Sequence, residues 1–126
     1  SSPLQAAVGM AVIDVIEREG LAANVAAVGE FLKAALAERK ARFASIADVR
    51  GHGLFVGVEI TKTDAARSPD SDKAIEIINR LKDKGFLSSN AGAFRNVVKI
   101  RPPLVFAQSH AEEFLVAFDA TMAELA

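Results

Sequence analysis

The chain has 126 residues, no cysteine, and fifteen Lys+Arg against sixteen Asp+Glu, which gives a net charge of −1. This length fits one domain, and the charge balance argues against a nucleic-acid or anionic-membrane footprint. Without cysteine, a disulfide framework and a thiolate metal site are excluded, and two distant histidines make any metal site improbable. We expect a cytoplasmic protein with no signal peptide and no run of residues that spans a bilayer.

The composition is more apolar than a domain of this size requires. Mean hydropathy is +0.23, and 51% of the residues are hydrophobic. Soluble domains average roughly 45–50% on a similar count. The excess predicts apolar surface that faces something outside these residues.

The first predicted helix carries much of this excess. Ser2 and Pro3 are typical of a helix start, and the sequence that follows is apolar nearly all round up to Asp14. A helix without a polar face is buried on every side. We therefore expect residues 1–20 to form an interfacial linking helix that ends at Gly20.

A second helix is predicted from about Leu21 to Arg39. Its inward stripe repeats at helical spacing and contains Leu21, Val25, Val28, Leu32, Ala35 and Leu36. Residues 46–50 predict only a stub of a strand, and Gly51-His52-Gly53 predicts a tight turn. The strand LFVGVEI follows at residues 54–60. One of its faces is fully apolar and consists of Leu54, Val56, Val58 and Ile60.

The polar segment 63–71 predicts an exposed loop before a third helix. Asp72 is the expected N-cap of this helix, and Gly85 is expected at the C′ position just past its end. The predicted inward residues are Ile75, Ile78 and Leu81.

Two more strands and a helix complete the chain. GFLSS, residues 85–89, predicts a short strand, residues 90–96 a loop, and residues 96–101 a further strand. The last helix is expected to begin with a capping box from Ser109 to Glu112. Its predicted inward residues are Phe114, Leu115, Phe118, Met122 and Leu125. The pattern predicts an α+β two-layer fold, in which helices pack on one face of a small antiparallel or mixed sheet of three to four strands.

The stretch VVKIRPPLVF, residues 97–106, places two cations inside an apolar run. Alternate residues of a strand share a face, so Lys99 and Arg101 should point the same way. Either they are the protective charges of an edge strand, or they clamp an anion, with the planar fork of arginine and the point charge of lysine. The pair Pro102-Pro103 would end the strand beside them.

Nothing in the sequence completes a catalytic motif. It contains no P-loop, no GxGxxG and no recognisable nucleophile turn. Gly51 and Gly53 are typical of a turn at a strand entry, and His52 and His110 are expected at the surface.

Four segments, taken in order, resemble the C-terminal part of class III aminotransferases, which are pyridoxal-phosphate enzymes of fold type I. They are SPLQAAVGMAVIDVIEREGL, ADVRGHGLFVGVEI, KGFLSSNAG and NVVKIRPPLVFAQSHAEEFLVAFDATMAEL. The likeness covers essentially the whole chain. It is strongest for the branch that reads KIRPPL or KFKPPM, which holds alanine–glyoxylate-like transaminases and related amino-alcohol-phosphate lyases.

The resemblance implies that these residues are part of a larger enzyme. Such an enzyme transfers an amino group from an amino acid or ω-amine to an oxo acid, works as a homodimer, and holds pyridoxal phosphate in a large domain. The cofactor lysine, the aspartate on the pyridinium nitrogen and the stacking aromatic belong to that domain. By this likeness residues 21–126 are the small domain, contain no catalytic residue and are inert alone. Ser1 and Ser2 would lie near the cofactor phosphate of the neighbouring subunit.

The resemblance also assigns residues to substrate binding. In many members the first cation of this strand is an arginine that binds the substrate carboxylate, and here that position is Lys99. The likeness implies a point charge from Lys99, and either a fork or a structural ion pair from Arg101. Ser88, Ser89 and Asn90, on the neighbouring strand exit, are weaker candidates.

Three alternatives stay open at this point. The chain could be a stand-alone domain that binds an anionic effector or regulates another protein. It could be a dimerisation module that has kept the fold of the small domain, or part of a phospho-lyase of the same family.

Overall fold

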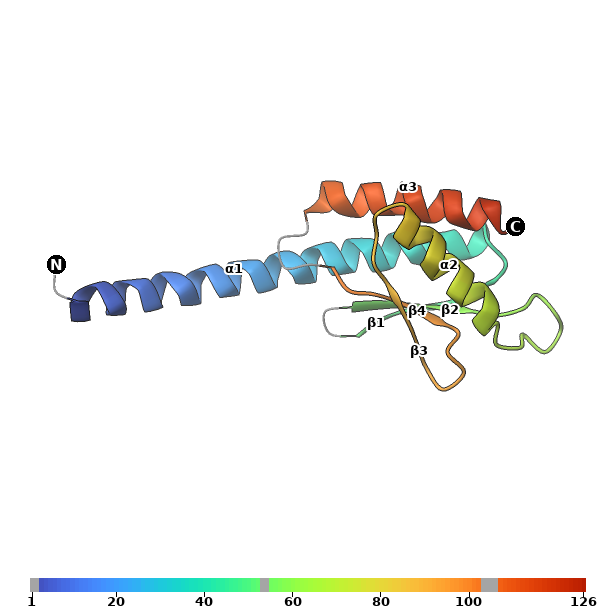
Figure 1. The fold of residues 1–126 in the computed structure, drawn as a ribbon, viewed down its shortest axis with the longest axis horizontal. Helices are drawn as coiled ribbons and strands as arrows, with labels where there is room; N and C mark the ends of the chain where they lie inside the picture. Colours follow the sequence, from blue (N-terminus) through green and yellow to red (C-terminus); the bar gives the residue numbers. More distant parts are fainter. Residues whose placement is uncertain (1–2, 53–54, 103–106) are drawn as a thin grey trace.

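The computed structural model describes the backbone of residues 3–52, 55–102 and 107–126, and the side chains within 20–51, 55–102 and 107–126. The elements, in order, are α1 (Pro3–Glu38), the 3₁₀ turn η1 (Arg39–Ala41), β1 (Ile46–His52), β2 (Phe55–Ile60), α2 (Ser71–Asp83), β3 (Ser89–Ala91), β4 (Val97–Ile100) and α3 (Gln108–Glu124). The strands form one antiparallel sheet in the order β1-β2-β4-β3. In Figure 1 the helices lie on one side of this sheet. The predicted α+β class is confirmed.

The core lies between the sheet and the helices. From the sheet it contains Ile46, Val56, Val58, Ile60, Val98 and Ile100, all buried. From the helices it contains Val28, Leu32, Leu36, Ile77, Leu81, Phe114, Phe118 and Met122. The alternation predicted for β2 is confirmed among its described residues, while Leu54 lies outside them. The inward stripes predicted for residues 21–39 and for α3 are confirmed in their main members.

The first helix does not end where the sequence predicts. It continues as one 36-residue helix through Gly20, so the predicted break is wrong. Glycine inside a helix costs only about 1 kcal/mol relative to alanine, and it stops a helix when it adopts a positive φ. Among the described glycines, only Gly85 and Gly92 have a positive φ. In Figure 1 the N-terminal part of α1 extends beyond the sheet and the other helices. The side chains of residues 1–19 lie outside the described part, so their interfacial role stays a prediction.

By length and composition alone, one described helical stretch, Gly20–Ala41, could cross a membrane. This differs from the expectation that no run is long enough. A single stretch of this kind is weak evidence, because core helices of soluble proteins pass the same test. Its buried residues Val28, Leu32 and Leu36 pack in the core beneath the sheet, which gives part of its apolar content a structural role.

The third predicted helix, α2, is present, but its start and its buried face differ from the prediction. Asp70 is the N-cap rather than Asp72, and its Oδ1 accepts a hydrogen bond from the backbone N–H of Lys73 at 3.1 Å. The inward residues are Ala74, Ile77 and Leu81. The predicted members Ile75 and Ile78 are exposed and half-buried, respectively. Three isoleucines within four positions leave the helical phase ambiguous in the sequence.

The end of α2 follows the prediction. Gly85 occupies the C′ position with φ 94°, a conformation that favours glycine. Its N–H donates to the Lys82 carbonyl at 2.9 Å, and the N–H of Phe86 donates to the Leu81 carbonyl at 2.9 Å. This pair of bonds is a Schellman motif, which satisfies carbonyls at the end of the helix.

The strands and the last helix bring three further corrections. β1 is a seven-residue strand that continues through Gly51 to His52, not a stub before a turn. The strand predicted at residues 85–89 is shifted and spans Ser89–Ala91. The capping box predicted at Ser109 is wrong because α3 begins earlier, with Ala107 at the N-cap. There the Ala107 N–H donates to His110 Nδ1 at 3.0 Å.

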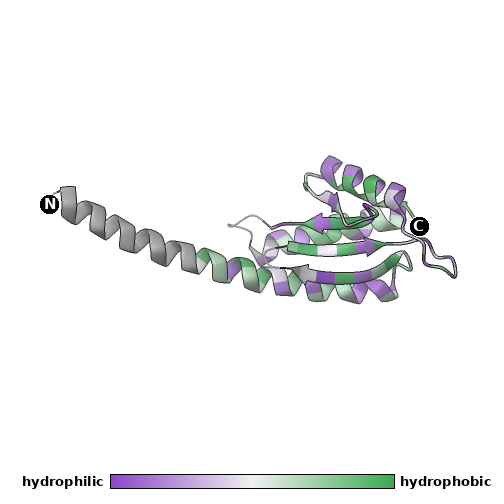
Figure 2. Cartoon of the chain, turned by 90° about the horizontal axis from the view of Figure 1, so that it is seen from below, coloured by the Kyte–Doolittle hydropathy of each residue, from purple (hydrophilic) through white to green (hydrophobic). Residues whose placement is uncertain are grey.

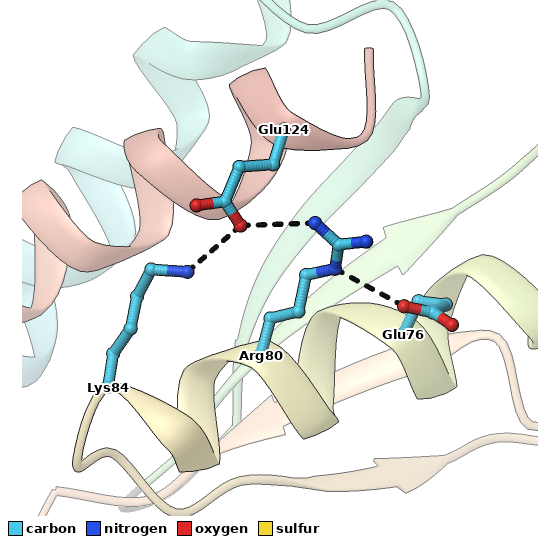
Figure 3. Close-up of polar contacts among 4 residues, drawn as sticks. All are labelled: Glu76, Arg80, Lys84 and Glu124. Carbon is cyan, nitrogen blue, oxygen red and sulfur yellow. Dashed lines mark hydrogen bonds and ion pairs between the residues drawn. The ribbon is translucent and has the colours of Figure 1, made fainter.

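Ion pairs fasten the helices to one another. The Arg39 guanidinium donates to both carboxylate oxygens of Asp119 on α3, at 2.8 and 3.0 Å. Figure 3 shows a second group, in which Glu124 of α3 accepts hydrogen bonds from Lys84 and Arg80, and Arg80 also contacts Glu76. These contacts hold the helical layer together from both sides of α3.

Candidate functional site

The face of the sheet away from the helices carries the polar side chains. Figure 2 shows the strands in front of the helices when the molecule is seen from below. Facing residues of antiparallel strands share a face, and the register pairs Gly57 with Lys99 and Glu59 with Val97. Their neighbours along each strand point into the core. We call this surface the open face.

Lys99 and Arg101 lie together at a shallow hollow at the margin of the open face. This hollow has a volume of about 300 Å³ and is lined by Leu87, Ser88, Ser89, Lys99 and Arg101. We call it the cation hollow. Ser89 is directly opposite Lys99 in the register of β3 and β4, so the sheet itself brings these two residues together. Four of the five residues predicted to bind substrate, namely Lys99, Arg101, Ser88 and Ser89, therefore meet at one place.

The remaining predicted residue, Asn90, lies elsewhere. It pairs with Val98 in the register and so has the opposite orientation to Ser89. Its Nδ2 donates to the Arg95 carbonyl at 3.4 Å, a long bond that ties it to the β3–β4 turn. Ser1 and Ser2, predicted near a cofactor phosphate, lie outside the described residues.

The position of β4 excludes one of the two interpretations of the cations. β4 lies inside the sheet, between β2 and β3, so the edge-strand interpretation of Lys99 is wrong. Across the described part of the chain, neither Lys99 nor Arg101 forms an ion pair. Arg50, on the same face, instead contacts Asp48 at 3.1 Å and Glu59 at 3.7 Å. Two cations without acidic partners beside a hollow can bind an anion.

Three features around the hollow were not expected. Leu87 is 81% exposed and forms an apolar lip. The Oγ of Ser88 is buried and has no hydrogen-bond partner among the described residues. Lys99 Nζ lies 4.3 Å from the centroid of the Phe55 ring on β2. The sequence places Phe55 two residues before Gly57, but only the register of β2 against β4 reveals its contact with Lys99.

A second hollow on the molecule has a volume of about 490 Å³. Its lining is mixed and includes Lys33, Val49, Arg50, Gly51, Phe55, Gly57, Gly92 and Val97. Phe55 lines this hollow and contacts Lys99 of the first one. Lys99 therefore lies between the two hollows.

The cation hollow suits the anionic group of a substrate better than a pyridine ring. A pyridoxal ring requires a lysine for its aldehyde and a charged partner for its ring nitrogen, and in the resembled family an aromatic side chain also stacks on it. Among the described residues, the lining contains neither an aromatic side chain nor an acid. The described residues of the hollow therefore fit an anion rather than the ring of the cofactor.

Comparisons with known proteins identify the family of the chain. A model of the family described as Aminotransferase class-III matches residues 1–122. The chain belongs to the class III aminotransferase family. Two curated relatives are "Alanine--glyoxylate aminotransferase 2 homolog 2, mitochondrial" of Arabidopsis thaliana and "Alanine--glyoxylate aminotransferase 2-like" of Drosophila melanogaster. They are 38% identical over 117 residues and 39% identical over 118 residues, respectively.

The match is nearly complete for this chain and partial for its relatives. Each of these two alignments covers 93% of this chain but only 24% of the relative, so the chain spans about a quarter of their length. Among solved structures, a phospholyase from Arthrobacter in complex with phosphoethanolamine superposes with a TM-score of 0.83 at 33% identity. That match covers 98% of this chain and 29% of the other.

Proposed function

We propose that these residues are the C-terminal small domain of a pyridoxal-phosphate-dependent aminotransferase. The parent would transfer an amino group from an amino acid or ω-amine to an oxo acid. The observation that carries the proposal is that Lys99, on the internal strand β4, and Arg101, just past its end, line one hollow, and neither has an acidic partner among the described residues. The class III family match along residues 1–122 supports the same reaction.

Each residue of the hollow has a distinct role in this proposal. The ammonium of Lys99 attracts the carboxylate of the substrate as a point charge, and the guanidinium of Arg101 offers it a planar fork. The Ser89 hydroxyl, on the neighbouring strand, can donate a hydrogen bond to the same group. Leu87 covers the aliphatic part of the substrate and excludes water from that side. Together these side chains fix which end of the substrate faces the reacting centre.

The cofactor and the remaining machinery belong to the rest of the parent. Bound pyridoxal phosphate supplies the electron sink for the chemistry at the amine carbon. The proposal places its lysine in a large domain outside these 126 residues, and it assigns a homodimer and a cytoplasmic location to the parent. The present residues alone should then be inactive.

Two measurements test the proposal. The longer protein that contains these residues should transfer an amino group from an amino acid or ω-amine to an oxo acid when loaded with pyridoxal phosphate. The 126-residue piece should neither turn over nor form a stable stoichiometric adduct with the cofactor. A tight adduct of the piece that survives dilution would contradict the assignment of the cofactor lysine to another domain.

A phospho-lyase is the second candidate, and a specific observation favours it. Two neighbouring cations suit a doubly charged phosphate better than a singly charged carboxylate. The Arthrobacter structure described above also holds phosphoethanolamine. Release of inorganic phosphate from phosphoethanolamine by the longer protein, without consumption of an oxo acid, would select this reaction. Formation of a new amino acid from an oxo acid would select the transaminase.

A further inference from the structure

The ammonium group of Lys99 is held by an aromatic ring. Its Nζ lies 4.3 Å from the centroid of Phe55, well inside the ~6 Å at which the face of a ring attracts a cation. Phe55 begins β2 and Lys99 lies in β4, and both side chains are half-buried. Phe55 does not line the cation hollow itself, and its contact with Lys99 links it to that hollow.

Gly57 makes this contact possible. It lies directly opposite Lys99 in the register, so no side chain separates the two strands at that level. Phe55 is two residues away along β2, on the diagonal that a long side chain can reach. A Cβ at position 57 would come within 3.0 Å of Val97 Cγ1, so close packing keeps this position small. The stem of Lys99 therefore has room to cross toward the ring.

The ring holds the ammonium group without neutralising it. Glu59, on the same face of β2, contacts Arg50 at 3.7 Å, and no ion pair joins it to Lys99 in the described structure. A carboxylate beside Lys99 would cancel most of the field that an anion in the hollow experiences. A ring restricts the flexible stem and leaves the full positive charge available.

We propose that Phe55 is a positioning residue for Lys99. Its ring fixes the ammonium at the wall of the cation hollow, where the carboxylate or phosphate of an amine substrate binds. The inference rests on the proposed function and adds a residue outside the hollow to the recognition of the anion.

The first test is kinetic and uses the longer protein loaded with its cofactor. Phe55→Leu should raise KM for the anionic substrate about three- to tenfold and leave kcat within about twofold, as expected for loss of one cation–π contact. Phe55→Tyr should keep the wild-type KM because it keeps the ring. Phe94→Leu is the matched control, since Phe94 is 68% exposed and lines neither hollow. If Phe55→Leu loses the fold, Phe55→Met is the second variant.

A double-mutant cycle separates positioning from a general structural effect. In a Lys99→Met background, Phe55→Leu should cause no further rise in KM. The same rise in both backgrounds would overturn the inference, and so would an unchanged KM in Phe55→Leu alone.

Thermal unfolding provides a readout that does not depend on turnover. The protein is titrated with inorganic phosphate and, in parallel, with acetate, and the anion that raises the unfolding temperature more is the one that the hollow prefers. Phe55→Leu should reduce the rise in unfolding temperature that this preferred anion causes. If the longer protein transfers no amino group but keeps this Phe55-dependent stabilisation, the proposed function fails and the inference stands. If it transfers amino groups while Phe55→Leu changes neither readout, the inference fails and the proposed function stands.

Discussion

The two faces of the sheet are built from the same strands but carry different kinds of side chain. On the covered face Val58, Val98 and Ile60 are fully buried against the helices. On the open face the alternate positions of the same strands hold Glu59 and Lys99. The covered face is apolar because each side chain there must exclude water, and its composition follows from the core alone. The open face has no such constraint, so its charges need another explanation.

The difference shows where function can be sought in this domain. Charged residues that satisfy one another, such as Arg50 and Glu59, are an ordinary solvated surface. Lys99 is different: it lies on a strand inside the sheet, so edge protection does not account for its charge, and no ion pair accounts for it among the described residues. The contrast between the faces therefore directs attention to the cation hollow.

The largest expected effect tests the covered face directly. Ile100→Ala, at a position 5% exposed, should reduce the free energy of unfolding by about 2–5 kcal/mol, because it removes buried methyl groups and leaves a cavity. Its neighbour Lys99 is the matched control, and Lys99→Met should cost less than about 1 kcal/mol. Urea unfolding of the 126-residue chain measures both. If Ile100→Ala and Lys99→Met reduced the free energy of unfolding equally, the distinction between the covered face and the open face would be wrong.

An intermediate effect is expected in the helical layer over the covered face. Asp119→Ala removes two charge-assisted hydrogen bonds from Arg39, at a site where both side chains are only 21% exposed. The free energy of unfolding should fall by about 1–3 kcal/mol, and less in high salt. Glu113→Ala, on an exposed part of the same helix, should change it by less than about 0.5 kcal/mol. If Glu113→Ala reduced the free energy of unfolding as much as Asp119→Ala, the Arg39–Asp119 ion pair would make no specific contribution to stability.

A smaller and pH-dependent effect is expected at the exposed ion pairs. Hydrogen bonds hold the pKa of Glu124 below its usual range, and the bond from Lys84 contributes more than the bond from Arg80. A carboxylate with a lowered pKa in the folded state stabilises the fold above its unfolded pKa, and loses this contribution as the pH falls through the folded value. Glu124→Gln should thus be less stable than the wild type near neutral pH, with a gap that closes below about pH 4.

Thermal unfolding across this pH range measures the gap. Glu112→Gln on the same helix is the control, since its side chain is exposed and forms no ion pair within the described structure. A gap between Glu124→Gln and the wild type that stays constant down to pH 2 would contradict the linkage.

The smallest change in the free energy of unfolding is expected at Ser88, in the lining of the cation hollow. Ser88→Ala removes a buried hydroxyl that has no hydrogen-bond partner among the described residues. Because no bond is lost and a polar group leaves the interior, the free energy of unfolding should change by less than about 0.5 kcal/mol or increase slightly. Urea unfolding measures this change. A clear loss of stability would mean that the hydroxyl has a partner in solution.

Much of the fold could be predicted because its signals are local. The alternation of Val56, Val58 and Ile60 predicts which face of β2 is buried, since the side-chain period of a strand is two. The ending of α2 at Gly85 was predictable because a positive φ favours glycine. Gly20 misled the prediction, since a helical glycine and a helix-ending glycine look alike until the φ angle is known.

The site was predictable only in part, for a physical reason. Lys99 and Arg101 are close in sequence, so the period of a strand is enough to place them together. Ser89 was predicted as a site residue only from the family resemblance, because its place opposite Lys99 depends on the register between β3 and β4. The contact with Phe55 depends on a second register, and a sequence pattern alone does not specify either one.

The central claim is that Lys99 and Arg101 recognise the anion of an amine substrate in a class III aminotransferase. The most direct test compares two amine donors in the longer protein, one with a carboxylate or phosphate and one that lacks it but is otherwise matched. In the Lys99→Ala/Arg101→Ala double variant, kcat/KM for the anionic donor should fall at least about tenfold through KM, while the value for the neutral donor stays within about twofold. Equal losses for both donors, or no loss for the anionic one, would contradict the claim.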